Sequence, residues 1–253
     1  MRKKLFMKRS LVFLLFLPLV LFFSCGGKTT TRPIKPKYKF TINGVVVKDL
    51  SLGKDIAYFT ILRDSVLFDS AVVKVGSDTL KSKGGGVYSK ETSHPSQLFG
   101  FGNVVTITVS SATDNFNFRY DAIIPGNFEI TGKNHDPVTA NLVDEVIVYF
   151  NSSAKATGYF TSVKRPDGSD GYTKRVPPES IGAMKLLRDT FYVGVTFTTG
   201  TYIIYLISYY KSFIGYPTMK FYLPDDLPKD NISNASGTIG AGVVAPLDSI
   251  KVE

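Results

Sequence analysis

The segment YKFTINGVVVKDLSLGKDIAYFTIL, residues 38–62, decides the fold class of this chain. In its first part, lysine and threonine separate the apolar residues Tyr38, Phe40 and Ile42. Alternation with a period of two is typical of a β-strand that buries one face. The last part, Ile56–Leu62, is rich in β-branched and aromatic residues, which suit a pleated sheet. The segment therefore predicts two β-strands and favours an all-β protein.

Similar strand-like runs continue up to residue 125. They are separated by turn residues at Gly76-Ser77-Asp78, Lys83–Gly86 and Ala112-Thr113-Asp114, at intervals typical of a β-sandwich. The predicted strands are Ser70–Val75, Gly86–Ser89, Val104–Val109 and Asn115–Ile124. No stretch here carries helical periodicity over three turns. We therefore predict a first β-sandwich domain over residues 38–125, with about seven strands.

Pro125-Gly126 marks a predicted domain boundary, after which a similar cycle restarts. Thr199-Gly200-Thr201 predicts a hairpin, and Pro178–Leu187 is the one stretch where a short helix is expected. Residues 225–253 are expected to form a C-terminal extension that packs on the body and ends in a strand at Ser249–Val252, with a disordered tail as the alternative. The predicted strands of this second β-sandwich domain, residues 126–224, are Asn127–Thr131, Glu145–Phe150, Thr157–Val163, Tyr172–Val176, Phe191–Thr198, Tyr202–Tyr210 and Lys220–Leu223.

Asp144–Val163 resembles the second and third strands of a fibronectin type III or related immunoglobulin-like domain. The matching features are the Val146–Tyr149 run, the Asn151–Ala154 turn, and Ala156–Tyr159 at the start of the next strand. The usual tryptophan of the family is absent, and Tyr149 stands nearest its place. The resemblance implies that residues 126–224 form a fibronectin type III-like β-sandwich. Together with the first domain, it predicts two tandem immunoglobulin-like β-sandwiches.

Composition and charge exclude several classes of protein. The chain has 253 residues, of which 43% are hydrophobic and 20% charged, an ordinary globular profile that excludes a disordered or collagen-like chain. The net charge of +9 depends on five basic residues in the first nine positions. The remainder of the chain carries 25 basic and 21 acidic residues, a net charge of +4. This is only mildly basic, so no nucleic-acid partner is expected.

Residues 1–24 are predicted to be a cleaved export signal. A basic stretch, Arg2–Arg9, precedes Leu11–Phe23, which is apolar throughout apart from Pro18. A membrane-spanning helix needs about 20 apolar residues, so this run is too short to remain as an anchor.

Leu21-Phe22-Phe23-Ser24-Cys25 resembles the lipobox of bacterial lipoproteins, although Phe22 stands where the family most often has leucine. The resemblance implies that the Cys25 thiol is diacylated, that a peptidase then cuts before Cys25, and that the new amine is usually acylated. The membrane is thus the expected partner, reached through Cys25 and a flexible tether over residues 25–37. Gly26 stands where an aspartate often signals inner-membrane retention, which favours the outer membrane in a Gram-negative envelope. An ordinary cleaved signal with a chance cysteine is the alternative.

No constellation of residues points to catalysis, a cofactor or a metal centre. His94 and His135 lie in predicted loops beside proline, with no carboxylate–serine pattern near them, so we expect solvent-exposed loop residues. Asp167–Gly171 resembles a calcium loop but lacks its later acids, and a plain turn is favoured. The glycines of Gly237–Gly242 have the wrong spacing for a dinucleotide site and are expected at turns or close contacts.

A tyrosine-rich stretch leaves one question open. In Tyr202–Tyr210 both alternating sets of side chains are apolar, although an exposed sheet should have one polar face. Either the strand is covered on both faces or an aromatic patch is exposed. Tyrosine is common at protein interfaces and stacks on sugar rings in many glycan-binding sandwiches. The candidate binding-surface residues are Tyr202, Tyr205, Tyr209, Tyr210 and Tyr222.

The sequence thus predicts a lipid-anchored envelope protein with a non-catalytic structural or partner-binding role, whose partner is an envelope protein or a polysaccharide. A carbohydrate-binding lipoprotein that uses the tyrosine-rich surface is the first alternative. An envelope enzyme is the second.

Overall fold

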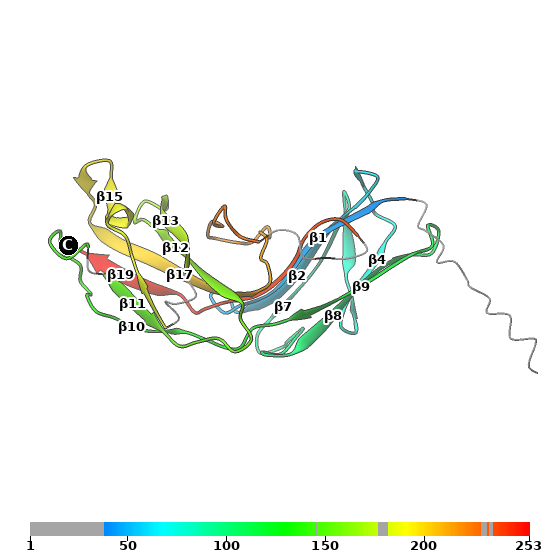
Figure 1. Cartoon of the computed structure of the whole chain (residues 1–253), viewed down its shortest axis with the longest axis horizontal. Coiled ribbons are helices and arrows are strands. Elements are labelled where there is room, and N and C mark those ends of the chain that lie inside the picture. Colours follow the sequence, from blue (N-terminus) through cyan, green and yellow to red (C-terminus); the bar gives the residue numbers. More distant parts are fainter. Residues whose placement is uncertain (1–37, 145, 177–181, 229–231, 233–234) are drawn as a thin grey trace, which may run out of the picture. The chain divides into compact units, whose positions relative to one another are not determined.

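The computed structural model describes residues 38–144, 146–176, 182–228, 232 and 235–253, which belong to one compact unit (Figure 1). Nearly all of its regular structure consists of β-strands, and the only helical turn among the described residues is the 3₁₀ helix η2, Arg188–Phe191. The predicted all-β sandwich class is confirmed. The export signal and the tether lie outside the described residues.

The largest sheet contains ten strands, which come from residues 40–93 and 158–252. In addition, β19 (Asp248–Val252) pairs with β17, and β3 (Val66–Leu67) pairs with β2. In order across the sheet, the main strands are β13 (Asp170–Val176), β12 (Gly158–Lys164), β17 (Gly200–Tyr210), β18 (Ile239–Val244), β1 (Phe40–Asp49), β2 (Lys54–Arg63), β7 (Val87–Ser93) and β6 (Lys81–Gly84).

Strand β18 lies in the middle of this sheet. It runs parallel to β1, with Val45 opposite Gly240, and antiparallel to β17, with Ser208 opposite Val243. The predicted packing of the C-terminal extension is therefore confirmed, and the disordered tail is wrong for β18 and β19. β1 from the first expected domain and β17 from the second both pair with β18, so strands from the two expected domains share one sheet. The domain boundary at residue 125 stays a prediction.

Three smaller sheets complete the fold. The two-stranded sheet is a hairpin of β15 (Tyr192–Val193) and β16 (Thr196–Phe197). The four-stranded sheet contains, in order, β5 (Asp78–Thr79), β4 (Val72–Val75), β8 (Val104–Ser111) and β9 (Phe116–Ile123). The three-stranded sheet contains β10 (Ile130–Lys133), β11 (Ile147–Phe150) and β14 (Ala183–Lys185).

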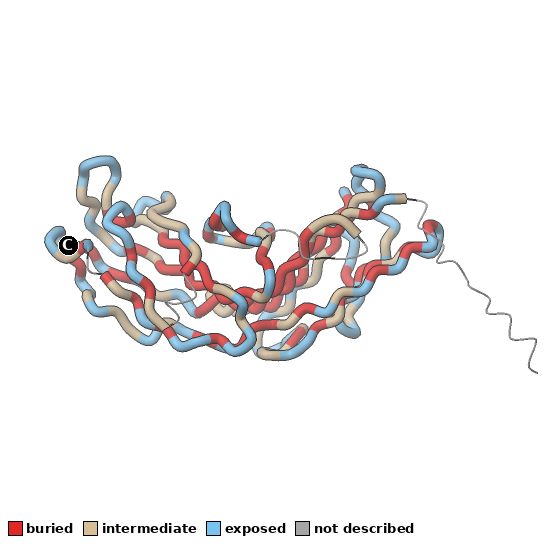
Figure 2. The backbone as a smooth tube through the Cα atoms, viewed as in Figure 1, coloured by how far each residue is buried: buried red, intermediate tan, exposed pale blue. Residues whose placement is uncertain are grey.

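Buried residues are concentrated along the strands of the large sheet (Figure 2), and their side chains form two hydrophobic clusters. On one face, Phe40 and Ile42 of β1 join a hydrophobic cluster. This cluster includes Val109 of the four-stranded sheet and Val148 of the three-stranded sheet. This cluster is the interior of the sandwich. On the other face, Val45 and neighbouring side chains join a second cluster. The large sheet is therefore covered twice, which explains why its central strands are apolar throughout.

The second cluster is covered by the irregular segment 211–228 rather than by a sheet. Phe213, Tyr216, Phe221 and Leu227 of this segment are buried against the sheet. The segment crosses β18 so closely that a Cβ atom on Gly240 would lie 2.7 Å from the carbonyl oxygen of Ser212. The expectation that glycines of the C-terminal extension allow close approach is thus confirmed at this position.

Four local predictions are wrong. Phe191–Thr198 is not a single strand, because Phe191 ends η2 and the residues that follow form the β15–β16 hairpin. Thr199–Thr201 does not join a hairpin, because β16 pairs with β15 while β17 pairs with β12, β18 and β19. Lys220–Leu223 is not a strand but part of the covering segment. In the stretch expected to be helical, residues 183–185 form β14, because Met184 pairs with Val148 of β11 and is buried in the core, whereas residues 178–181 lie outside the described part.

Replacement of Gly240 by alanine tests the contact between β18 and the covering segment. The new methyl group would meet backbone atoms of Ser212 and Phe213, which cannot rotate away as a side chain can. We expect G240A to lower the free energy of unfolding by about 1–3 kcal/mol, measured by urea titration. Gly132→Ala is the matched control, because nothing lies within 4 Å of its added methyl group. Equal effects of the two substitutions would contradict the close packing described above.

Candidate functional site

The most elaborate polar cluster in the described structure lies where β1 ends and β2 begins. Lys48 and Asp55 are directly opposite each other on these antiparallel strands. The Lys48 Nζ atom lies 2.8 Å from Oδ1 and 3.0 Å from Oδ2 of Asp55, and it donates to the carbonyl oxygen of Phe99 at 2.9 Å. The side chains of Lys48 and Asp55 are 1% and 0% exposed. The pair is therefore a fully buried contact between opposite charges.

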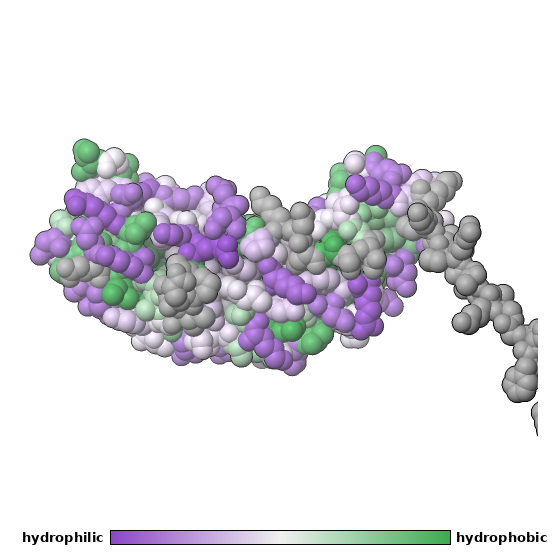
Figure 3. Space-filling view, in the orientation of Figure 1, coloured by the Kyte–Doolittle hydropathy of each residue, from purple (hydrophilic) through white to green (hydrophobic). Residues whose placement is uncertain are grey.

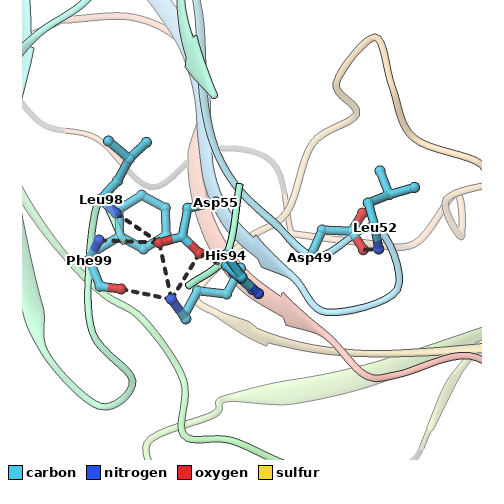
Figure 4. A network of polar contacts seen from close by, with 7 residues as sticks. Asp49, Leu52, Asp55, His94, Leu98 and Phe99 are labelled. Carbon is cyan, nitrogen blue, oxygen red and sulfur yellow. Dashed lines mark hydrogen bonds and ion pairs between the residues drawn. The ribbon is translucent and has the colours of Figure 1, made fainter. Parts of the chain in front are cut away.

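The loop between β7 and β8 completes the cluster (Figure 4). The backbone N–H groups of Leu98 and Phe99 donate to Asp55 Oδ2 at 2.8 and 3.4 Å, and His94 Nε2 lies 3.0 Å from Asp55 Oδ1. The rings of Phe99 and Phe101 lie 5.7 and 4.9 Å from the Lys48 Nζ atom. One carboxylate thus ties a long loop to the large sheet.

Sequence reasoning missed most of this cluster. Lys48 follows three valines at the end of β1, and nothing in that pattern separates a buried lysine from a solvated one. His94 was expected to be a solvent-exposed loop residue, and its side chain is only 28% exposed because it packs on Asp55. The sequence feature that could have indicated the cluster is the pair of opposite charges, Lys48 and Asp55. Each lies beside an apolar run, at the point where one predicted strand ends and the next begins.

A second buried carboxylate lies next to Lys48 in the sequence but serves the opposite face of the sheet. The Tyr216 hydroxyl donates to Asp49 Oδ2 at 2.7 Å, and the N–H of Leu52 donates to Oδ1 at 3.0 Å. Burial, together with the nearby Asp49 carboxylate, raises the pKa of Tyr216 well above its usual range and also raises the pKa of Tyr205. Both phenols therefore remain neutral at physiological pH, and Tyr216 fastens the covering segment to the sheet.

The tyrosine-rich strand divides its side chains between the two clusters. Tyr202 is buried in the sandwich interior, and Tyr205 and Tyr209 are buried under the covering segment. These three residues do not form a binding surface, which corrects that part of the prediction. Tyr210 is half-buried, and Tyr222 is 56% exposed with the Lys164 Nζ atom 5.8 Å from its ring. The strand is apolar on both sides because it is central and covered twice.

The described residues provide no cluster of three or more histidine, cysteine, aspartate or glutamate side chains that would hold a metal ion. The suggested calcium loop is an ordinary turn, in which Asp167 Oδ1 accepts the N–H of Ser169 at 2.9 Å and Gly168 adopts a φ of 83°. This backbone conformation explains the glycine without a ligand.

Comparison with known proteins gives no further identification. No family model matches this chain, and no curated protein matches it. In the described residues there is also no helix with the length and apolar character of a membrane span.

Replacement of Lys48 by methionine tests the buried cluster. It removes one charge and leaves the Asp55 carboxylate buried without its partner. We expect K48M to lower the free energy of unfolding by about 3–5 kcal/mol, measured by urea titration.

Lys54→Met is the matched control, since Lys54 pairs with Glu91 at 2.9 Å while both side chains are more than a third exposed. Because solvent screens this pair, K54M should cost about 1 kcal/mol or less. A loss in K48M no larger than that in K54M would contradict the importance of the cluster for the fold.

Proposed function

We propose that this protein is a lipid-anchored component of a bacterial cell envelope, and that its β-sandwich body has a non-catalytic structural or partner-binding role. The observation that carries the proposal is the sequence Leu21–Cys25 at the end of a short apolar run. Cys25 is the only cysteine of the chain. Since each buried CH₂ group contributes about 0.8 kcal/mol, two or three acyl chains would form a lasting anchor. The glycine at position 26 favours the outer membrane in a Gram-negative cell.

The partner-binding role is supported by a hydrophobic tip on the body. The β15–β16 hairpin presents Val193 and Val195 to solvent, with Val195 96% exposed (Figure 3). Exposed apolar side chains that lie together are typical of contact sites, although single ones are common on any surface. Loops and hairpins at the end of a rigid sandwich also suit recognition. This tip is a better candidate surface than the tyrosine strand.

The glycan-binding alternative required exposed tyrosine rings on which a sugar could stack. Tyr205 and Tyr209 were expected to provide these rings, but both lie under the covering segment. Of the five tyrosines considered, only Tyr222 is exposed, with 56% of its surface open to solvent. We therefore place an envelope protein ahead of a polysaccharide as the partner.

Replacement of Cys25 by serine tests the anchor. We expect the wild-type protein to incorporate labelled fatty acid in bacterial cells and to fractionate with membranes. The C25S variant should incorporate none, because the thiol that accepts the diacylglyceryl group is gone. Continued labelling of C25S, or an unlabelled wild-type protein, would contradict the anchor.

Replacement of Val195 by serine tests the hydrophobic tip. If the tip contacts an envelope protein, chemical cross-linking in intact cells should give a specific cross-linked product with the wild type that falls at least several-fold in V195S. Val104→Ser is the matched control, because Val104 is another exposed valine, at the start of β8. A cross-linked product that survives V195S, or that V104S removes equally, would contradict a role for the hairpin.

A further inference from the structure

The arrangement of Lys48, Asp55 and the β7–β8 loop points to a covalent modification, independent of the lipid anchor. We propose that the Lys48 Nζ atom and the Asp55 side-chain carboxyl group condense to an amide, which forms an intramolecular isopeptide bond across β1 and β2. The two side chains are already in contact, with Nζ 2.8 Å and 3.0 Å from the two carboxylate oxygens. Because both are almost completely buried, no solvent competes for either group.

Proton transfer within the buried pair is the first step of the condensation. Removing two charges from water is costly, and one proton transfer from nitrogen to oxygen abolishes both charges. The product of that transfer is a free amine beside a carboxylic acid, which is the combination that condensation requires. The rings of Phe99 and Phe101, 5.7 and 4.9 Å from Nζ, keep the surroundings largely apolar.

Each atom of the expected amide has a partner already in place. The Phe99 carbonyl oxygen, 2.9 Å from Nζ, would accept the one N–H that remains on the amide nitrogen. The N–H groups of Leu98 and Phe99, which donate to Oδ2 at 2.8 and 3.4 Å, would hold the negative charge that develops on this oxygen during attack. Oδ2 would then become the amide oxygen and keep both hydrogen bonds.

The remaining oxygen, Oδ1, is the leaving group, and it is the one that lies 3.0 Å from His94 Nε2. The nitrogen attacks Cγ, a C–N bond forms, and the Cγ–Oδ1 bond breaks. Of the three protons on the ammonium group, one passes to Oδ1 before the attack, one reaches it afterwards through the His94 imidazole, and one stays on the amide. Oδ1 leaves as water, no atom is oxidised or reduced, and His94 is regenerated. Since His94 is 28% exposed, it also connects the cluster to solvent.

Intact-mass measurement of the folded full chain tests the proposal, with Cys25→Ser present to avoid acylation. We expect a mass lower by one water than the sequence requires, whereas the Lys48→Met variant should show its full sequence mass. In Asp55→Asn the same amide would form with loss of ammonia, so its final mass should equal that of the wild type. His94→Gln, which removes the proton relay from a partly exposed position, should slow the loss of water after synthesis of the chain at least tenfold.

Digestion with trypsin locates the bond. An unmodified Lys48 allows cleavage, which releases the free peptide Phe40–Lys48. The cross-linked chain should instead give residues 40–54 joined to residues 55–63. An uncut linear peptide 40–63 has the same mass, so the cross-linked species must be recognised by its two amino termini, at Phe40 and Asp55. A wild-type protein that is folded by circular dichroism, keeps its full mass and releases Phe40–Lys48 would overturn the proposal.

Discussion

The pairing of β18 with β1 and β17 is the constraint on which the rest of the structure depends. The two neighbours of β18 come from opposite ends of the preceding chain, and without β18 each would have an unpaired edge in the middle of the large sheet. Unpaired edges in a sheet are prone to pair with other chains. The body therefore cannot be completed until the last residues of the chain are available. Pairings of such high sequence separation also favour slow folding.

This central strand also explains how the sheet acquired two covered faces. Every residue of β18 is buried, and its glycines leave room for the backbone at Ser212 and Phe213 to cross directly above it. The covering segment is then fixed by its aromatic side chains and by the hydrogen bond from Tyr216 to Asp49. Because both faces of the central strands are used for packing, the side chains of β18 are not available as a binding surface.

Sequence reasoning was most successful where local pattern decides the outcome. The strands at residues 56–62, 104–109 and 202–210 could be predicted because alternation and β-branched residues are properties of neighbouring positions. The pairing of these strands depends on contacts across the whole chain. Thr199–Thr201 has the composition of a hairpin, yet Gly200 begins a strand whose partners are elsewhere. Likewise, the sequence showed that both alternating sets of side chains in Tyr202–Tyr210 are apolar. The reason is that residues 211–228 cover the second face of this strand.

The buried charges could not be predicted for a related reason. Lys48 and Asp49 are neighbours in the sequence, and a strand directs them to opposite faces, so they belong to different clusters with different partners. Lys48 is satisfied by a residue across the hairpin and by the loop at Phe99, while Asp49 is satisfied by Tyr216 from the covering segment. These two positions thus fasten the β7–β8 loop to one face and residues 211–228 to the other. The end of β1 thereby fastens both irregular segments to the large sheet, and this rigid body carries the exposed β15–β16 hairpin.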